Sequence, residues 1–189
     1  MKIGILGGTF NPVHNGHINL AREAVRHLGL DRLIFMVAYI SPHKEMPDGV
    51  SASDRVEMVR QAIQGQERFE VSTYEIEKKG KSYSIDTVRW LRSQSDSSAE
   101  VFFITGSDSI KDLPSWKNID DLLLLSKFVV ATRPGYPLEG VPEKALRMNI
   151  VPNALSSSDI RERIRKNLPI EGLVPDQVKD YIVAKGLYR

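Results

Sequence analysis

Two histidines, His14 and His17, stand in a glycine-rich string of the type that handles phosphate groups. The string is GGTFNPVHNGH and begins at Gly7. Because glycine has no Cβ, a nucleotide can approach the main chain at Gly7 and Gly8. The imidazoles are one helical turn apart, so both can reach the same anion. This pattern indicates phosphate binding, although a glycine turn followed by two surface histidines explains the same residues without a ligand.

The elements around this string position it at the end of a strand. Residues 3–6 are a short apolar run that predicts a strand, and apolar residues recur at helical spacing over residues 15–29. A second buried strand is expected at residues 33–37, parallel to the first. The string therefore lies between a strand and a helix, where the helix dipole and unpaired backbone N–H groups favour an anion.

Strands and helices continue to alternate along the chain, separated by Pro- and Gly-rich loops at residues 38–50 and 133–142. Further strands are predicted at residues 69–73, 101–105, 128–132 and 148–151, and helices from Ser51 or Ser53, at residues 84–93, 108–113 and 119–125, and from about residues 157 and 175. This alternation predicts an α/β fold with an open, mostly parallel sheet and helices on both faces. We expect one domain over residues 1–189, with a small C-terminal helical part at about residues 156–189.

The composition excludes several classes of protein. The chain has 189 residues, of which 41% are hydrophobic and 26% charged, so it can form a core and is not a disordered, collagen-like or coiled-coil chain. Lysines and arginines number 26 against 24 acidic residues, a net charge of +2 that is too small for a broad nucleic-acid surface. We therefore expect a local anion site and no nucleic-acid partner.

Cysteine content and hydropathy predict the compartment. The chain has no cysteine, which excludes disulfides, zinc-thiolate sites, iron–sulfur clusters and thiol nucleophiles. No apolar run approaches the roughly 20 residues of a membrane span, and the apolar N-terminal run is too short for a signal peptide. We expect a cytoplasmic protein without a membrane partner.

The residues at 14–17, His-Asn-Gly-His, resemble the HxGH signature of the nucleotidyltransferase superfamily. Seven further segments, in order and spacing, resemble bacterial nicotinate mononucleotide adenylyltransferases. They are SPHK at 41–44, GKSYSIDT at 80–87, GSD at 106–108, LPSW at 113–116, RPG at 133–135, SSSDIR at 156–161 and GLY at 186–188. The resemblance covers nearly the whole chain and implies a Rossmann-like fold.

The resemblance also implies the reaction. Such enzymes transfer AMP from ATP to nicotinate mononucleotide, giving nicotinate adenine dinucleotide (deamido-NAD) and pyrophosphate in NAD biosynthesis. The acceptor 5′-phosphate attacks the α-phosphorus directly, so the protein aligns two anions and stabilises charge. Mg²⁺ is expected to arrive with ATP, held by phosphate oxygens and water, and no protein metal ligand is expected.

For ATP, the resemblance implies a site at both ends of the chain. The expected ATP-binding residues are Gly7, Gly8, Thr9, Phe10, His14, His17, Gly106, Asp108, Arg133, Ser156, Ser157, Ser158 and Arg161. Of these, His14, His17 and Arg161 are expected to stabilise phosphate charge together with Lys44, and His17 is the better candidate for the α-phosphate. Simpler roles remain open: Lys44 as a solvated loop residue, Asp108 as a helix cap and Ser156–Ser158 as an ordinary serine cap.

For the mononucleotide, the resemblance implies a ring pocket with an aromatic face. The expected residues are Asn11, His43, Lys44, Tyr83, Ser84, Ile85, Thr87, Trp116 and Lys117. Main-chain N–H groups would hold the nicotinate carboxylate, and a carboxamide would point a donor at a donor, so acid should be preferred over amide. Lys117 stands where an aromatic residue is expected in many relatives, and Trp116 could instead be only a core residue.

Two other functions stay open. A related adenylyltransferase acting on nicotinamide mononucleotide or phosphopantetheine would share the HxGH string, and only the acceptor pocket separates these enzymes. A non-catalytic nucleotide sensor would bind ATP without releasing pyrophosphate. An RNA-binding module is disfavoured because basic residues are dispersed among nearly equal acids. The expected partners are thus ATP and nicotinate mononucleotide, and homo-oligomer formation is left open.

Overall fold

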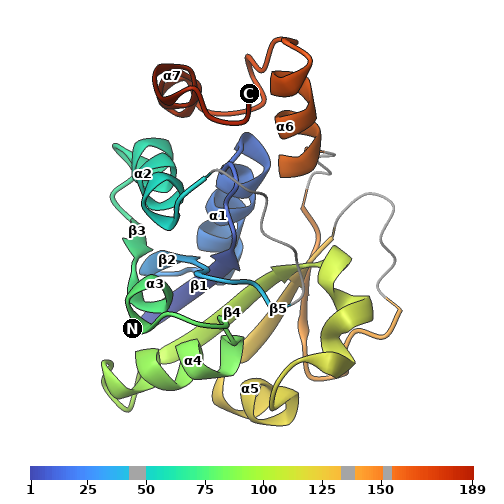
Figure 1. Cartoon of the computed structure of the whole chain (residues 1–189). Coiled ribbons are helices and arrows are strands. Elements are labelled where there is room, and N and C mark those ends of the chain that lie inside the picture. Colours follow the sequence, from blue (N-terminus) through green and yellow to red (C-terminus); the bar gives the residue numbers. More distant parts are fainter. Residues whose placement is uncertain (43–49, 133–138, 151–154) are drawn as a thin grey trace.

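A six-stranded parallel sheet forms the centre of the molecule (Figure 1). The computed structural model describes residues 1–42, 50–132, 139–150 and 155–189. In the order β3-β2-β1-β4-β5-β6, the strands are β3 (Phe69–Ser72), β2 (Arg32–Val37), β1 (Lys2–Gly8), β4 (Glu100–Gly106), β5 (Lys127–Ala131) and β6 (Leu146–Met148). The strand order reverses between β1 and β4. In open α/β sheets, ligands bind beyond the carboxyl ends of the strands at such a reversal.

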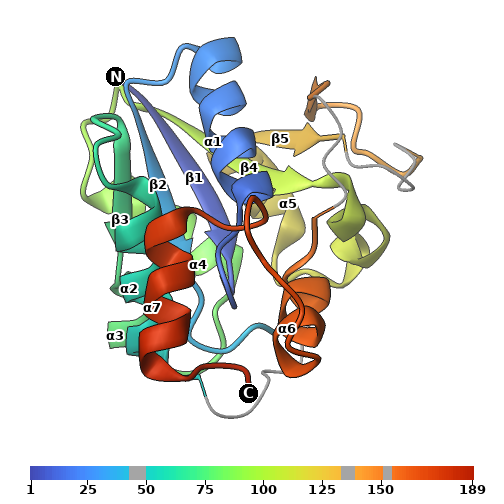
Figure 2. The same ribbon diagram turned by 90° about the horizontal axis from the view of Figure 1, so that it is seen from above.

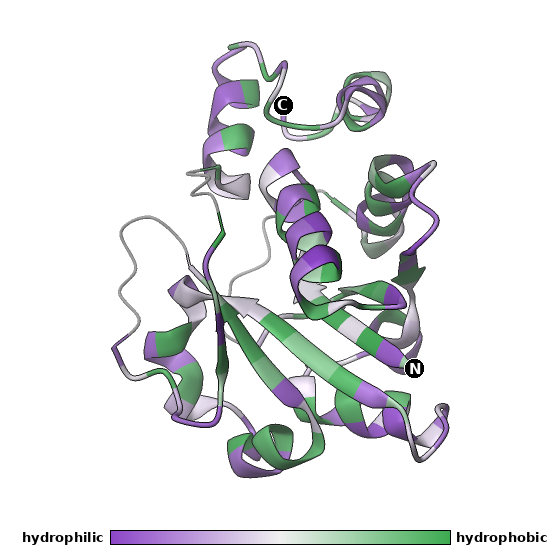
Figure 3. Ribbon diagram, turned by 180° about the vertical axis from the view of Figure 1, so that it is seen from behind, coloured by the Kyte–Doolittle hydropathy of each residue, from purple (hydrophilic) through white to green (hydrophobic). Residues whose placement is uncertain are grey.

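The strands alternate their side chains between two apolar clusters, one on each face of the sheet. On β2, Leu33 and Phe35 enter one cluster, whereas Ile34 and Met36 enter the other. Burial on both faces explains why β2 is a continuous apolar run. Figure 3 shows the same distribution, with green strands inside and purple on the outer sides of the helices. The expected α/β class, with a parallel sheet covered on both faces, is confirmed.

Helices cover the two faces unequally. One face carries α1 (Asn15–Leu28), α2 (Ala52–Ile63), α6 (Ser157–Arg165) and α7 (Asp176–Lys185), and the other carries α4 (Ser84–Ser93), the 3₁₀ helix η1 (Ser107–Ser115) and α5 (Ile119–Leu125). Figures 1 and 2 both show α7 beside α2 and place α6 near the start of α1. The C-terminal helices therefore extend the α1 face beyond the end of the sheet.

Local sequence signals explain where several helices begin and end. α1 ends at Gly29 in the left-handed conformation, with φ of +62°, and α7 ends in the same way at Gly186, with φ of +61°. Of the two expected caps for α2, Ser51 is the one used. Its hydroxyl accepts from the Asp54 N–H at 3.0 Å, while Asp54 accepts from the Ser51 N–H, which completes a capping box.

Three elements differ from the sequence prediction. A short helix, α3 (Tyr74–Lys78), follows β3 and has too few residues to show helical periodicity. The helix predicted at 108–113 is 3₁₀ and contains Pro114. The last strand begins at Leu146, two residues before its predicted start at Met148. Leu146 and Arg147 are exposed there at the sheet edge, so no apolar pattern marked them.

No helix within the described residues has the length and apolar character that crossing a bilayer requires.

Candidate active site

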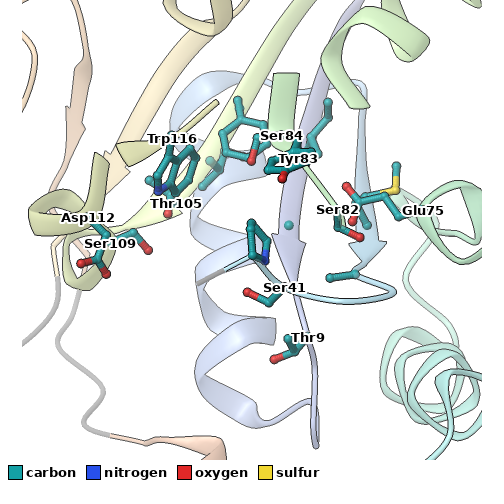
Figure 4. Close-up of a pocket in the computed structure, with 18 of the residues that line it drawn as sticks. Thr9, Ser41, Glu75, Ser82, Tyr83, Ser84, Thr105, Ser109, Asp112 and Trp116 are labelled. Atoms are coloured by element: carbon teal, nitrogen blue, oxygen red, sulfur yellow. The ribbon is translucent and has the colours of Figure 1, made fainter. Parts of the chain in front are cut away.

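Two adjoining cavities open at the carboxyl ends of β1 and β4, where the strand order reverses. One has a volume of about 150 Å³ (Figure 4) and the other about 770 Å³. Both are lined by Gly7, Gly8, Thr9, Thr105, Asp108, Ser109 and Asp112. A ligand in one cavity can therefore reach a ligand in the other across this shared stretch. We call them the small and the large cavity.

The paired histidines line the large cavity from the start of α1. His14 is the residue before the helix and His17 is in its first turn, and their rings stack with centroids 3.7 Å apart. The His14 backbone N–H donates to His17 Nδ1 at 3.2 Å. Since an accepting Nδ1 carries no proton, a neutral His17 carries its proton on Nε2. The string thus holds two imidazole rings in one defined arrangement.

Gly16 suits this arrangement. A Cβ added there would lie 3.0 Å from both Cε1 and Nδ1 of the His14 ring, closer than most real Cβ contacts, so the ring would have to move. At Gly106 an added Cβ would overlap Oδ1 of Asp108, so that side chain would have to move. The glycine of the HxGH string and the glycine ending β4 both leave room for a neighbouring functional side chain.

The start of α6 forms the opposite wall of the large cavity. Ser156, Ser157, Ser158 and Arg161 all line it. Ser156 caps the helix by accepting from the Asp159 N–H at 3.1 Å, whereas Ser157 donates to the Pro12 carbonyl at 2.9 Å. One serine is therefore a cap, and its neighbour attaches α6 to the loop after β1.

Arg161 connects the same two segments. Its Nη1 donates to the Asn11 carbonyl oxygen at 2.7 Å and its Nη2 to the Ser158 hydroxyl at 3.1 Å. Burial lowers the pKa of the guanidinium, which nonetheless stays charged because an arginine pKa starts so high. A fixed positive charge therefore lies on the wall of the large cavity.

Aromatic side chains bound the small cavity. Figure 4 shows Trp116 and Tyr83 with Ser84 at one end, and Asp112 and Ser109 beside Trp116. The Trp116 ring also packs edge-on against Phe103, with centroids 6.0 Å apart. Trp116 therefore both contacts the core and lines the cavity.

Lys117 adds positive charge at the rim of the small cavity. Its Nζ lies 4.6 Å from the Tyr83 ring centroid and donates to Asp86 Oδ1 at 3.2 Å. Lys78 donates to the same carboxylate at 2.6 Å. Burial acts to raise the pKa of Asp86, but the hydrogen bonds from Lys78 and Lys117 outweigh it and hold the pKa below its ordinary value. Two cations thus share one carboxylate beside Tyr83.

Most of the sequence-predicted residues line the two cavities. Those that do are Gly7, Gly8, Thr9, Asn11, His14, His17, Gly106, Asp108, Ser156, Ser157, Ser158, Arg161, Tyr83, Ser84, Trp116 and Lys117. The side chains of Phe10, Ile85 and Thr87 are buried instead and line neither cavity. Ile85 faces the sheet from the first turn of α4, which puts it in the core. His43, Lys44 and Arg133 lie outside the described residues.

Sequence reasoning missed two buried charged residues beside the cavities, Arg55 and Glu75. Arg55 did leave a signal, because it is four residues before Val59 and eight before Ile63 and so occupies the apolar stripe of α2. Glu75 left none, since α3 is too short for its buried side to be recognised.

Comparisons with known proteins agree with this geometry. The cytidylyltransferase-like family model matches residues 5–163. The nicotinate-nucleotide adenylyltransferase of Bacillus subtilis is 42% identical over 187 residues, which is 99% of this chain and 98% of the relative. A probable nicotinate-nucleotide adenylyltransferase of Halalkalibacterium halodurans is 44% identical, with 100% and 91% of the two chains covered.

The fold comparison points the same way. The nicotinic acid mononucleotide adenylyltransferase of Plasmodium falciparum, solved with APC, superposes with a TM-score of 0.81 at 20% identity, covering 99% of this chain and 96% of that one. At this identity the likeness concerns the fold. The family model and the full-length bacterial relatives establish more: the chain belongs to the cytidylyltransferase-like family and, within it, to the nicotinate-nucleotide adenylyltransferases.

Proposed function

We propose that this protein transfers AMP from ATP to nicotinate mononucleotide, giving nicotinate adenine dinucleotide and pyrophosphate. The observation that carries the proposal is the pair of cavities sharing the stretch from Gly7 to Thr9, one bounded by histidines and α6, the other by aromatic rings. ATP occupies the large cavity and the mononucleotide the small one. This division suits a reaction that brings two phosphorylated ligands together.

The transfer needs no protein nucleophile. An oxygen of the acceptor 5′-phosphate attacks the α-phosphorus in line, a new P–O bond forms, and the bond to the bridging oxygen of the β-phosphate breaks as pyrophosphate leaves. Charge grows on the equatorial oxygens and on the leaving group. The protein contributes alignment and fixed positive or hydrogen-donating groups at those oxygens.

These stabilising roles fall to His14, His17 and Arg161. His17 donates from Nε2 to the α-phosphate, and Arg161, held in place by Asn11 and Ser158, offers its positive charge and its remaining N–H groups to the departing phosphates. Ser156–Ser158 at the start of α6 and the backbone of Gly7–Phe10 at the end of β1 support the triphosphate. Asp108 accepts from ribose hydroxyls beside Gly106.

Three residues outside the described ranges complete the proposal on their sequence positions. Lys44 and His43 follow the predicted second strand, and Lys44 brings a point charge to the phosphates. Arg133 comes two positions after the last residue of β5 in the sequence, and we propose that its backbone contacts the adenine edge.

The mononucleotide ring stacks on Trp116, near Tyr83. The carboxylate of the nicotinate ring lies at the start of α4. The backbone N–H groups of Ser84 and Ile85 are in the first turn there and have no acceptor within the helix. Thr87 supports this turn from within. Both carboxylate oxygens accept, whereas a carboxamide nitrogen would face a donor, so the acid is preferred over the amide. Lys117 strengthens the preference with positive charge at the rim.

Mg²⁺ enters with ATP. Among the described residues there is no cluster of three or more side chains able to hold a metal ion, although the carboxylates of Asp108 and Asp112 line the stretch shared by both cavities. Carboxylate, phosphate and water oxygens are the ligands Mg²⁺ prefers. Phosphate oxygens would hold most of its shell, and the ion would offset phosphate charge there.

We further propose that the chain works as one nucleotidyltransferase domain in the cytoplasm, with small-molecule substrates as its partners. The absence of cysteine supports a reducing compartment. The nearly balanced charge supports a role without nucleic acid.

The test is pyrophosphate release with ATP and Mg²⁺. Nicotinate mononucleotide, nicotinamide mononucleotide and phosphopantetheine are compared as acceptors at equal concentration, with a no-acceptor control. We expect strong preference for the first. Equal use of the acid and the amide would refute the assignment of the carboxylate pocket. Preference for phosphopantetheine would refute nicotinate mononucleotide as the acceptor. ATP binding without pyrophosphate release would mean that the protein is a nucleotide sensor.

A further inference from the structure

Two buried charged side chains have no role in the transfer described above: Arg55 lines neither cavity, and Glu75 lines the small cavity from its buried side. Arg55, on α2, is 1% exposed, and Glu75, on α3, is 8% exposed. Burying a charge is unfavourable unless hydrogen bonds compensate for the lost water. The hydrogen-bond partners of Arg55 and Glu75 therefore indicate which parts of the structure these two residues hold together.

Arg55 donates to main-chain carbonyls of two separate loops. Its Nη1 donates to Thr9 at 2.9 Å and to Ala38 at 2.5 Å, and its Nη2 donates to Tyr39 at 3.2 Å. Thr9 belongs to the loop after β1 and lines both cavities, whereas Ala38 follows β2 and lines the small cavity. One guanidinium thus holds an ATP-side loop against the segment after β2. Burial lowers its pKa without removing the charge.

The chain of hydrogen bonds continues from that segment to the mononucleotide pocket. The Tyr39 N–H donates to the Ser82 hydroxyl at 2.9 Å, and the Ser82 N–H donates to the Ile40 carbonyl at 2.9 Å. Ser82 lines the small cavity together with Tyr83 and Ser84, which follow it. The segment after β2 is therefore attached on one side to Arg55 and on the other to the start of α4.

Glu75 forms the far end of this chain. Its carboxylate is hydrogen-bonded to the side chains of Thr87, within α4, and Ser82, just before α4. Figure 4 shows Glu75 and Ser82 together at one side of the small cavity, with Trp116 at the other. Glu75 thereby holds the first turn of α4, whose backbone we assign to the nicotinate carboxylate.

We infer that Arg55 and Glu75 are positioning residues that act through this chain to set the distance and angle between the ATP loop and the mononucleotide pocket. The inference rests on the proposed function, since it concerns alignment of that function's two substrates. In-line attack is sensitive to misplacement of about 1 Å, which can lower the rate about 100-fold. Loss of the chain should therefore reduce turnover more than it reduces binding of either substrate.

The experiment compares Arg55→Lys and Glu75→Gln with a matched control, Arg92→Lys. Arg92 also donates to two main-chain carbonyls, Leu125 at 2.9 Å and Ala99 at 2.6 Å, but lines neither cavity. A lysine retains charge but cannot reproduce the forked contacts. For each full-length variant, we would measure kcat well below its melting temperature. Calorimetry would give the Kd and stoichiometry for nicotinate mononucleotide and for a non-hydrolysable ATP analogue.

We expect Arg55→Lys and Glu75→Gln to lower kcat by about 10- to 100-fold. Both Kd values should stay within about threefold and both stoichiometries near one, and the control should match the wild type. The fold-decrease in kcat of the double variant should be smaller than the product of the two single fold-decreases, because both substitutions break the same chain of hydrogen bonds. If the binding stoichiometry fell while kcat per binding-competent molecule stayed normal, the substitutions would only have reduced the fraction of folded protein. Arg55 and Glu75 would then have a structural role only, which would overturn the inference.

Two further outcomes are also decisive. Multiplicative losses in the double variant would show two independent supports and overturn the shared chain. Should Arg55→Lys fail to fold, Ser82→Ala, which removes the middle hydroxyl and no charge, carries the same expectation for kcat. Inactive wild-type protein would instead contradict the proposed function, so the two failures are distinguishable.

Discussion

The neighbours of His17 restrict the orientation of its ring. The His14 N–H occupies Nδ1, the His14 ring stacks on one face and the Phe10 ring lies edge-on with its centroid 5.1 Å away. Gly16 makes room for the His14 ring. At the scale of single residues, the HxGH string thus orients the His17 ring and its hydrogen-bond donor.

His17→Ala should lower kcat by about 100-fold or more, because it removes a donor to charge that develops in the transition state. The melting temperature should change little. His27→Ala is the control, since His27 is on the same helix, near its exposed end. Steady-state kinetics and thermal melts of both variants check this, and near-normal kcat in His17→Ala would contradict the role.

Trp116→Ala should raise KM for the mononucleotide far more than KM for ATP, because ring stacking acts in the ground state and the transition state alike. Trp90→Ala is the control. Trp90 stacks on Tyr74 with centroids 4.2 Å apart and lines neither cavity. It should lose stability with both KM values unchanged. Equal effects of Trp116→Ala on both substrates would remove Trp116 from the ring pocket.

At the scale of elements, α7 is attached to α2 through Asp54. The Tyr181 hydroxyl donates to Asp54 Oδ1 at 2.9 Å, while Ser51 donates to Oδ2. The Ser51 hydrogen bond, aided by that from Tyr181, holds the pKa of Asp54 below its ordinary value of 3.8 despite partial burial. Burial and the Asp54 hydrogen bond raise the pKa of Tyr181 to about 12.

Asp54→Asn should lower the free energy of unfolding by about 1 kcal/mol at neutral pH, the typical value of a helix cap or a hydrogen bond. Because the pKa of Asp54 is lower in the folded protein than in the unfolded chain, its ionised carboxylate stabilises the folded protein at pH values above the unfolded-state pKa. This stabilisation is lost as the pH falls through the folded-state pKa. The difference between variant and wild type should therefore close as pH falls below 3.8.

Urea unfolding from neutral pH to about pH 3 measures this difference. Asp180→Asn, which removes an exposed carboxylate of α7, is the control and should show no such convergence. A difference that stays constant down to the lowest pH would show that ionised Asp54 is not responsible.

At the scale of the whole molecule, the C-terminus meets the loop that follows β1. The Tyr188 hydroxyl donates to Asn11 Oδ1 at 2.6 Å across 177 residues of sequence. Asn11 is buried and Tyr188 is half-buried, and burial raises the pKa of Tyr188, so the phenol stays protonated as a donor. Leu187 packs into the same apolar cluster as α1, α2 and α7. The C-terminus therefore stabilises the loop that follows β1.

Tyr188→Phe should lower the free energy of unfolding by about 1 to 3 kcal/mol, because the buried Asn11 oxygen loses its partner. Removing residues 187–189 should cost more, since buried Leu187 is lost as well. Urea denaturation gives both values, and ATP protection of the variants reports on the loop. A Tyr188→Phe variant as stable as the wild type would show that this contact contributes nothing.

The sequence by itself determined most of the local elements and pointed to many of the residues that line the cavities. Helices at 84–93 and 119–125 were predicted with the observed bounds, because helical periodicity is a local property. His14, His17, Trp116 and Ser156–Ser158 were singled out by their motifs and the family resemblance that these carry, and all of them line the cavities.

Only the tertiary structure decided which of those residues face the cavities and which buried charges hold them. Ile85 and Thr87 share a motif with Ser84 yet turn into the interior, because successive helical residues point in different directions. Arg55 is buried only because carbonyls from the loops after β1 and β2 meet it, and Glu75 because α4 packs against α3. Because these hydrogen-bond partners are separated in the sequence, no local sequence pattern predicts the pairing. Only folding brings them within hydrogen-bonding distance.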